Sequence, residues 1–165
     1  MADMLVKLYE LDFSEFQKEK YGKVVSIIRA LSPDKSKVLK FVKDNFNENW
    51  VNECEKAFSN NPISCFIAVK EKNVIGFGCY DATARGFFGP TGIREDYRNN
   101  GIGKNILMSC LLDMWDHDYG YAIIGWANNA KGFYEKTVHA KEIENSFPGI
   151  YKRMIDLCGP EQKKI

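Results

Sequence analysis

The sequence predicts one mixed α/β domain, and three features of the chain carry this prediction. Residues 63–93 read as three consecutive strands separated by short turns, which is typical of an antiparallel sheet. From about 101 to 118, apolar residues recur every three to four positions, the period of an amphipathic helix. A continuous apolar run at 121–127 suits a strand buried on both faces. With 165 residues, the chain can form one sizeable core but not two ordinary domains.

The first third of the chain alternates strand-like and helix-like segments. Ser32 followed by Pro33 is a favourable helix start, and Asn-Asn-Pro at 60–62 ends a later helix. In order, we expect a strand over 4–11, a short helix over 14–21 with Ser14 as its N-cap, a strand over 23–31, and helices over 32–46 and 48–59.

The remainder of the chain carries most of the sheet. No internal repeat, low-complexity tract or linker interrupts it. We expect strands over 64–70, 73–81 and 85–93, a helix over 101–118, a strand over 121–127, a helix over 129–138, and a closing antiparallel pair formed by 140–146 and 149–157 around Phe147-Pro148-Gly149.

A glycine-rich stretch at 96–105, "DYRNNGIGKN", leads into the long amphipathic helix. It suits neither a helix interior nor a strand, but it places backbone N–H groups where an anion can reach them. A P-loop would need glycine in place of Arg98 and Ser or Thr in place of Asn105. A dinucleotide fingerprint would need a third glycine in place of Ile106. Both patterns are therefore disfavoured.

The same stretch matches Arg-x-x-Gly-x-Gly between a strand and an amphipathic helix, with Arg98, Gly101 and Gly103 at the fixed positions. Glycines let the backbone approach a ligand closely and adopt positive φ. Unpaired N–H groups at a helix N-terminus hold a pyrophosphate, and Arg98 adds a permanent cation. The alternative, a turn that merely starts a helix, leaves the arginine at this spacing unexplained.

Residues 89–111, "GPTGIREDYRNNGIGKNILMSCL", resemble the coenzyme A-binding motif of the GNAT (Gcn5-related N-acetyltransferase) superfamily. Residues 121–140, "YAIIGWANNAKGFYEKTVHA", resemble the strand and helix that follow it. The resemblance implies the GNAT fold, a mostly antiparallel mixed sheet flanked by helices, whose splayed central strands bind acetyl-CoA. It divides the chain into an N-terminal extension (1–22), an acetyltransferase domain (23–158) and a tail (159–165).

The resemblance also implies a set of contacts to acetyl-CoA, the acetyl donor. The coenzyme arm enters the gap between "GPTGI" and "IIGWA". The implied contacts are backbone groups of Gly92, Ile93 and Arg94 to the pantetheine arm, then Arg98, Asn99, Asn100, Gly101, Ile102, Gly103 and Lys104 around the pyrophosphate, and Asn129, Phe133 and Lys136 from the following helix.

The reaction implied is direct attack of a neutral amine on the thioester, without an acyl-enzyme. Tyr134 falls on the tyrosine of the family, four residues after Ala130, and would donate a proton to the departing thiolate. A phenol is neutral at pH 7 and can donate. The alternative is an ordinary core or surface aromatic, because the chain has eight tyrosines.

No general base is visible in the sequence. Many family members carry a carboxylate in the strand expected at 85–93, but here none lies between Phe87 and Ile93. Asp81 is at least six residues away, about 20 Å along an extended strand. We therefore expect a water relay to a backbone carbonyl or to a distant carboxylate.

The expected acceptor is a small primary amine. Trp126, Trp50 and Phe87 are candidate acceptor contacts, although such aromatics are also ordinary core residues. Together, "GPTGIREDYRNNGIG", "IIGWA" and "PGIY" resemble family members that acetylate amino sugars, which favours glucosamine or a glucosaminide. The alternatives are a peptide or protein amine as the acceptor, or an acyl-CoA-sensing module without turnover.

The composition of the chain limits the kinds of partner that we expect. With 23 basic and 22 acidic residues the net charge is +1, which favours neither nucleic acid nor a membrane surface. No long apolar run or signal peptide is visible. The five cysteines are scattered without a Cys-x-x-Cys pair, so we expect reduced thiols and no metal site. We also expect a cytoplasmic protein that is a monomer or a homodimer.

Overall fold

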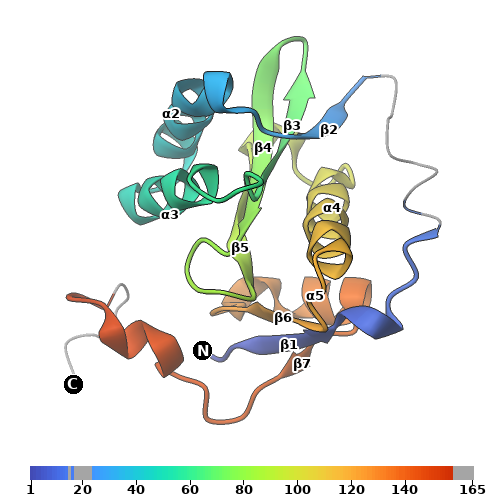
Figure 1. The fold of residues 1–165 in the computed structure, drawn as a ribbon, viewed down its shortest axis with the longest axis vertical. Helices are drawn as coiled ribbons and strands as arrows, with labels where there is room; N and C mark the ends of the chain where they lie inside the picture. Colours follow the sequence, from blue (N-terminus) through green and yellow to red (C-terminus); the bar gives the residue numbers. More distant parts are fainter. Residues whose placement is uncertain (15, 17–23, 158–165) are drawn as a thin grey trace.

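In the computed structural model, which describes residues 1–14, 16 and 24–157, seven strands form one sheet with helices on both faces (Figure 1). The strands are β1 (Met4–Lys7), β2 (Ser26–Arg29), β3 (Cys65–Lys70), β4 (Asn73–Tyr80), β5 (Phe87–Ile93), β6 (Tyr121–Ile124) and β7 (Lys141–Glu142). The α-helices are α2 (Lys35–Asn45), α3 (Glu48–Phe58), α4 (Ile102–Asp116) and α5 (Lys131–Val138). The described helices include none that is long and apolar enough to cross a bilayer.

The strand order is β2-β3-β4-β5-β6-β1-β7. β5 and β6 run parallel, whereas the other neighbouring strands in the described sheet run antiparallel. The prediction of a mostly antiparallel mixed sheet flanked by helices is confirmed.

Each face of the sheet has its own apolar core. Helices α2 and α3 cover one face of the β3–β5 region, and α4 covers the other (Figure 1). Side chains alternate along β3 accordingly. Cys65 and Ile67 join the core under α2 and α3, while Phe66 and Ala68 join the core under α4.

The N-terminal strand lies inside the sheet rather than at its edge. β1 pairs with β6 on one side and with β7 on the other. Its alternate residues Met4 and Val6 are almost fully buried. The strand is shorter than the expected 4–11, because Leu8–Glu10 turns into a 3-10 helix.

The expected closing hairpin is wrong. β7 pairs with β1, and Gly149–Arg153 forms a 3-10 helix instead of a strand. Gly149 has a left-handed φ of 58°, which leads the chain out of an extended path. Burial of Tyr151 against Trp126, with ring centroids 4.1 Å apart, replaces strand pairing for this segment.

Two other predicted elements are matched only in part by the described residues. The strand expected over 121–127 stops at Ile124, and Trp126 adopts a left-handed φ of 47° in the turn that follows. Most of the helix expected over 14–21 lies outside the described residues. At its start, the carboxylate of Asp12 accepts a hydrogen bond from the backbone N–H of Ser14 at 2.9 Å.

Candidate active site

The parallel strands β5 and β6 separate after a short paired stretch. Phe87 and Phe88 face Ile123 and Ile124, and beyond this point β5 continues against β4 while β6 ends. The β4–β5 register shifts here, and Gly89 has a φ of 121°, which glycine adopts at little cost. A bulge bends a strand, so these features turn β5 away from β6.

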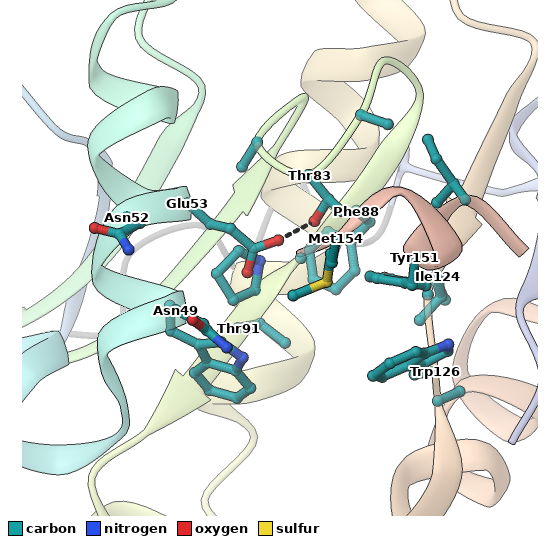
Figure 2. A pocket seen from close by; sticks show the side chains of 18 of the residues that line it. Asn49, Asn52, Glu53, Thr83, Phe88, Thr91, Ile124, Trp126, Tyr151 and Met154 are labelled. Atoms are coloured by element: carbon teal, nitrogen blue, oxygen red, sulfur yellow. Dashed lines mark hydrogen bonds between the residues drawn. The ribbon is translucent and has the colours of Figure 1, made fainter. Parts of the chain in front are cut away.

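A pocket of about 1290 Å³ opens in this gap (Figure 2). It is lined by helix α3, the loop 82–85, residues 88–91 of β5, residues 124–128 at and after the end of β6, and the C-terminal 3-10 helix. Typical small-molecule pockets measure about 300–1,000 Å³, so this one is large enough for a small-molecule ligand. The gap expected between "GPTGI" and "IIGWA" is therefore present.

Tyr134 lines this pocket from α5. Its side chain is buried, and its ring packs edge-on against Phe88, with centroids 6.3 Å apart. Burial raises the pKa of Tyr134 to about 12, so the phenol keeps its proton at neutral pH. The other residues expected from this region, Asn129, Phe133 and Lys136, are exposed and do not line the pocket.

Glu53 of α3 also faces the pocket, and sequence reasoning missed it (Figure 2). The hydroxyl of Thr83 donates a hydrogen bond to its carboxylate. Burial raises the pKa of Glu53, and the bond from Thr83 opposes this rise. One signal was available: Asn49 precedes Glu53 by four residues, which places two polar side chains on one face of the helix.

The loop that carries Thr83 is fixed by Asp81. The carboxylate of Asp81 accepts hydrogen bonds from the backbone N–H of Gly86 at 2.7 Å and from the hydroxyl of Tyr119. The side-chain amide of Asn60 donates to the Asp81 carbonyl at 3.1 Å. Asp81 therefore positions this wall of the pocket and does not itself line it.

Aromatic side chains form two further walls. Trp126 lies between Tyr151 and Phe147, with centroids 4.1 and 5.9 Å from its own. Trp50 lines the pocket from α3. Phe87 does not line the pocket but its neighbour Phe88 does, because successive side chains of a strand point to opposite faces.

The predicted phosphate site is an exposed turn at the end of β5. Gly101 is the N-cap of α4 with a left-handed φ of 76°, and buried Ile102 anchors the first turn. The first N–H groups of a helix have no intrahelical partner and attract anions. Arg98 is exposed, and its Nε donates to the carbonyl of Ile93 at 3.2 Å, which holds the guanidinium beside the turn.

The other residues predicted here lie on the same surface. Asn99 has a φ of 65°, Asn100 donates to the carbonyl of Tyr97, and Lys104 is exposed in the first turn of α4. The Arg94 side chain forms two hydrogen bonds to Asp96, at 2.7 and 2.9 Å, and its backbone N–H donates to the carbonyl of Ile75 at 2.9 Å.

Gly92 has a packing role as well. A Cβ at Gly92 would collide with the ring of Phe46, which also packs against Trp50 with centroids 5.0 Å apart. The glycine at this position of β5 therefore lets the aromatic side chains between α2 and α3 approach the sheet.

Three of the cysteines come together in the core. The sulfur atoms of Cys54, Cys65 and Cys79 lie within 4.8 Å of one another, and all three side chains are fully buried. They come from α3, β3 and β4, which is why their sequence spacing gave no signal. No cysteine of the described chain lines the pocket.

Solved structures with the same fold include GNAT proteins. A GCN5-related glucosamine N-acetyltransferase region of a fungal multi-domain GH3 β-N-acetylglucosaminidase is 13% identical, with a TM-score of 0.68 over 86% of this chain and 19% of that chain. A GCN5-related N-acetyltransferase from Sphaerobacter thermophilus is 13% identical, with a TM-score of 0.66 over 86% and 48%. A GCN5-related N-acetyltransferase-like protein from Streptococcus suis is 12% identical, with a TM-score of 0.59 over 86% and 58%.

At these identities the likeness establishes the fold, and the chain spans from 19% to 58% of the length of these proteins. The family model described as "Acetyltransferase (GNAT) family" matches residues 8–139, most of the chain. This chain therefore belongs to the GNAT acetyltransferase family, and the predicted resemblance to this family is confirmed. A search of curated proteins finds no matching sequence.

Proposed function

We propose that this chain transfers the acetyl group of acetyl-CoA to the primary amine of an amino sugar, with glucosamine or a glucosaminide as the acceptor. The observation that carries the proposal is the pocket between the separated strands β5 and β6, with the phenol of Tyr134 in its wall. The N-terminus of α4, which follows β5 in the chain, is the proposed anion site.

The exposed turn of 98–104 is the proposed pyrophosphate site, with Arg98 and Lys104 as cations and the N–H groups of Gly103 and its neighbours as donors. The pantetheine arm runs along Gly92, Ile93 and the backbone of Arg94 into the pocket. Asn129, Phe133 and Lys136 are proposed contacts to the outer part of the coenzyme. The exposed position of these three side chains is compatible with that role.

The proposed reaction is one direct transfer. The lone pair of the neutral amine forms the new C–N bond to the thioester carbon, and the C–S bond breaks. Tyr134 gives its proton to the sulfur that leaves, and the proton that the nitrogen loses as the amide forms restores the Tyr134 phenol. The high pKa of Tyr134 keeps this donor in its neutral form throughout the physiological range.

The polar and aromatic composition of the pocket supports the amino sugar. The Asn52 amide can donate and accept hydrogen bonds, and the hydroxyl oxygens of Thr83 and Thr91 can accept them, while Trp126 and Tyr151 supply an apolar wall. Sugars present both kinds of surface. The fungal glucosamine N-acetyltransferase region has the same fold, which agrees with this choice of acceptor.

Release of free thiol from acetyl-CoA tests the proposal. The protein is incubated with acetyl-CoA and, in turn, glucosamine, an aliphatic diamine and a lysine-bearing peptide. Thiol release with glucosamine above the rate without acceptor supports the proposal. Release with none of the amines, while acetyl-CoA binds, would favour an acyl-CoA-sensing module.

A further inference from the structure

Glu53 places a carboxylate inside the pocket without a cation beside it. It extends from α3 toward the loop that carries Thr83 (Figure 2). The ion pairs of the described residues do not include Glu53, and its pKa responds to burial and to Thr83 rather than to a nearby charge. A half-buried carboxylate without a cationic partner is unfavourable for folding. Its presence in a pocket therefore indicates a role in ligand binding.

The groups around Glu53 do not supply that cation. The phenols of Tyr134 and Tyr151 line the pocket from α5 and the C-terminal 3-10 helix, and burial raises the pKa of each, so both are neutral at pH 7. The charged residues that line the pocket otherwise are exposed: Glu48, Arg85 and Arg153. Among the described charged residues that line the pocket, Glu53 is therefore the one whose side chain is half-buried.

We infer that Glu53 binds the protonated amine of the acceptor and takes its proton. The inference rests on the proposed function for the acetyl donor, and it names the residue for which the sequence offered no candidate. It also states a selectivity: the pocket takes acceptors that arrive as ammonium cations.

The protons balance with one carboxylate. The ammonium gives one proton to the Glu53 carboxylate, which becomes a neutral carboxyl, and the amine becomes a nucleophile. Attack on the thioester forms the C–N bond and breaks the C–S bond. The thiolate gains a proton from Tyr134, the second proton that leaves the nitrogen restores the Tyr134 phenol, and Glu53 then returns its proton to water. Ammonium and acetyl-CoA give amide, free thiol and one proton.

The raised pKa of Glu53 suits this task, because a carboxyl of higher pKa holds a proton from an amine more readily. Thr83 donates its hydroxyl hydrogen to one carboxylate oxygen and so holds the side chain in place.

Binding can be measured without turnover. Trp50 and Trp126 line the pocket, so their fluorescence reports on its occupancy. We expect glucosamine to change the emission of the wild type at pH 7, and Glu53→Gln to weaken that binding at least tenfold. Glu55→Gln is the matched control, because Glu55 lies on the same helix but is exposed and paired with Lys35 at 3.0 Å. Equal glucosamine affinity in Glu53→Gln and wild type would overturn the inference.

The pH dependence of kcat/KM separates a proton acceptor from a structural residue. With glucosamine and acetyl-CoA, Glu53→Gln should lose about 10²-fold at neutral pH, the lower range for a lost general base. The loss should shrink by about tenfold per pH unit as the free amine becomes available, until pH passes the amine pKa. A loss of the same size at every pH would assign Glu53 a structural role and overturn the inference.

The two proposals fail in different ways. If the wild type binds glucosamine through Glu53 but releases no thiol from acetyl-CoA, the proposed acetyl transfer fails and the ammonium site stands. If the wild type acetylates glucosamine and Glu53→Gln matches it at all pH values, the transfer stands and the role of Glu53 is refuted.

Discussion

The hydroxyl group of Tyr151 lies against the backbone of Gly125, in the space that any side chain at position 125 would need. This contact joins the end of β6 to the C-terminal 3-10 helix and brings Tyr151, with Ile150 and Met154, to the pocket wall. Gly125 is thus needed for its lack of a side chain, because a Cβ would push the tyrosine away from the strand.

Gly125→Ala should therefore disturb the acceptor side of the pocket. We expect an increase of about tenfold in KM for the acceptor, equivalent to about 1.4 kcal/mol, with coenzyme affinity unchanged. Steady-state kinetics and calorimetry measure the two effects. Gly120→Ala is the control, since a Cβ there meets no atom within 4 Å. Wild-type KM in Gly125→Ala would show that the Tyr151 contact does not shape the acceptor site.

Gly103→Glu tests the phosphate site by charge. A Cβ at Gly103 meets only Ile93, at an ordinary 3.7 Å, so the fold should tolerate the side chain. A carboxylate in the first turn of α4 would repel the pyrophosphate, and we expect a loss of acetyl-CoA affinity of at least about 10²-fold by calorimetry. Gly103→Gln, of the same size but neutral, should lose less. Normal affinity in a folded Gly103→Glu variant would place the pyrophosphate elsewhere.

Tyr134→Phe removes the proposed proton donor without creating a cavity. Turnover should fall by about 10²-fold, the scale of a lost general acid, while coenzyme affinity changes little. Tyr121→Phe, at an exposed position of β6, is the control. Because the pKa of Tyr134 is about 12, the wild-type rate should show no loss from its ionisation below about pH 11. Unchanged turnover, under conditions where chemistry limits the rate, would remove Tyr134 from the mechanism.

The ionised carboxylate of Glu53 should lower the free energy of unfolding at neutral pH. Burial raises its folded pKa above the ordinary value of 4.5, so the folded state binds its proton more readily than the unfolded state. The resulting stabilisation is present below the unfolded pKa and is lost as pH rises through the folded pKa.

Relative to wild type, Glu53→Gln should therefore have a higher free energy of unfolding at pH 7, and this advantage should shrink as pH falls through the raised folded pKa to 4.5. Urea unfolding at both pH values measures the difference, with Glu55→Gln as the control. A less stable Glu53→Gln at pH 7 would mean that the carboxylate makes favourable contacts in the folded protein.

Local patterns predicted the elements around the coenzyme site well. Apolar periodicity located α4 within two residues at each end, because its buried face follows the helical period. The glycines before it also predicted the left-handed turn at Gly101, since that conformation excludes most other residues.

The same local patterns could not predict which distant strands pair with each other. The local sequence does not indicate that β1 lies between β6 and β7. The apolar alternation near the C-terminus was also compatible with the predicted hairpin. Glu53 was missed for a related reason. Its helix was predicted, but the wall opposite it is formed by Thr83 and Tyr151, which are far away in the sequence.

A direct comparison of kcat/KM for glucosamine and for a lysine-bearing peptide at pH 7 tests the choice of acceptor. Neighbouring oxygens lower the pKa of the glucosamine amine below the lysine value of about 10.4, so transfer of its proton to Glu53 is easier. We predict acetylation of glucosamine, with N-acetylglucosamine and free coenzyme A formed in equal amounts, and little activity on the peptide. Equal or faster acetylation of the peptide lysine would contradict the choice of acceptor.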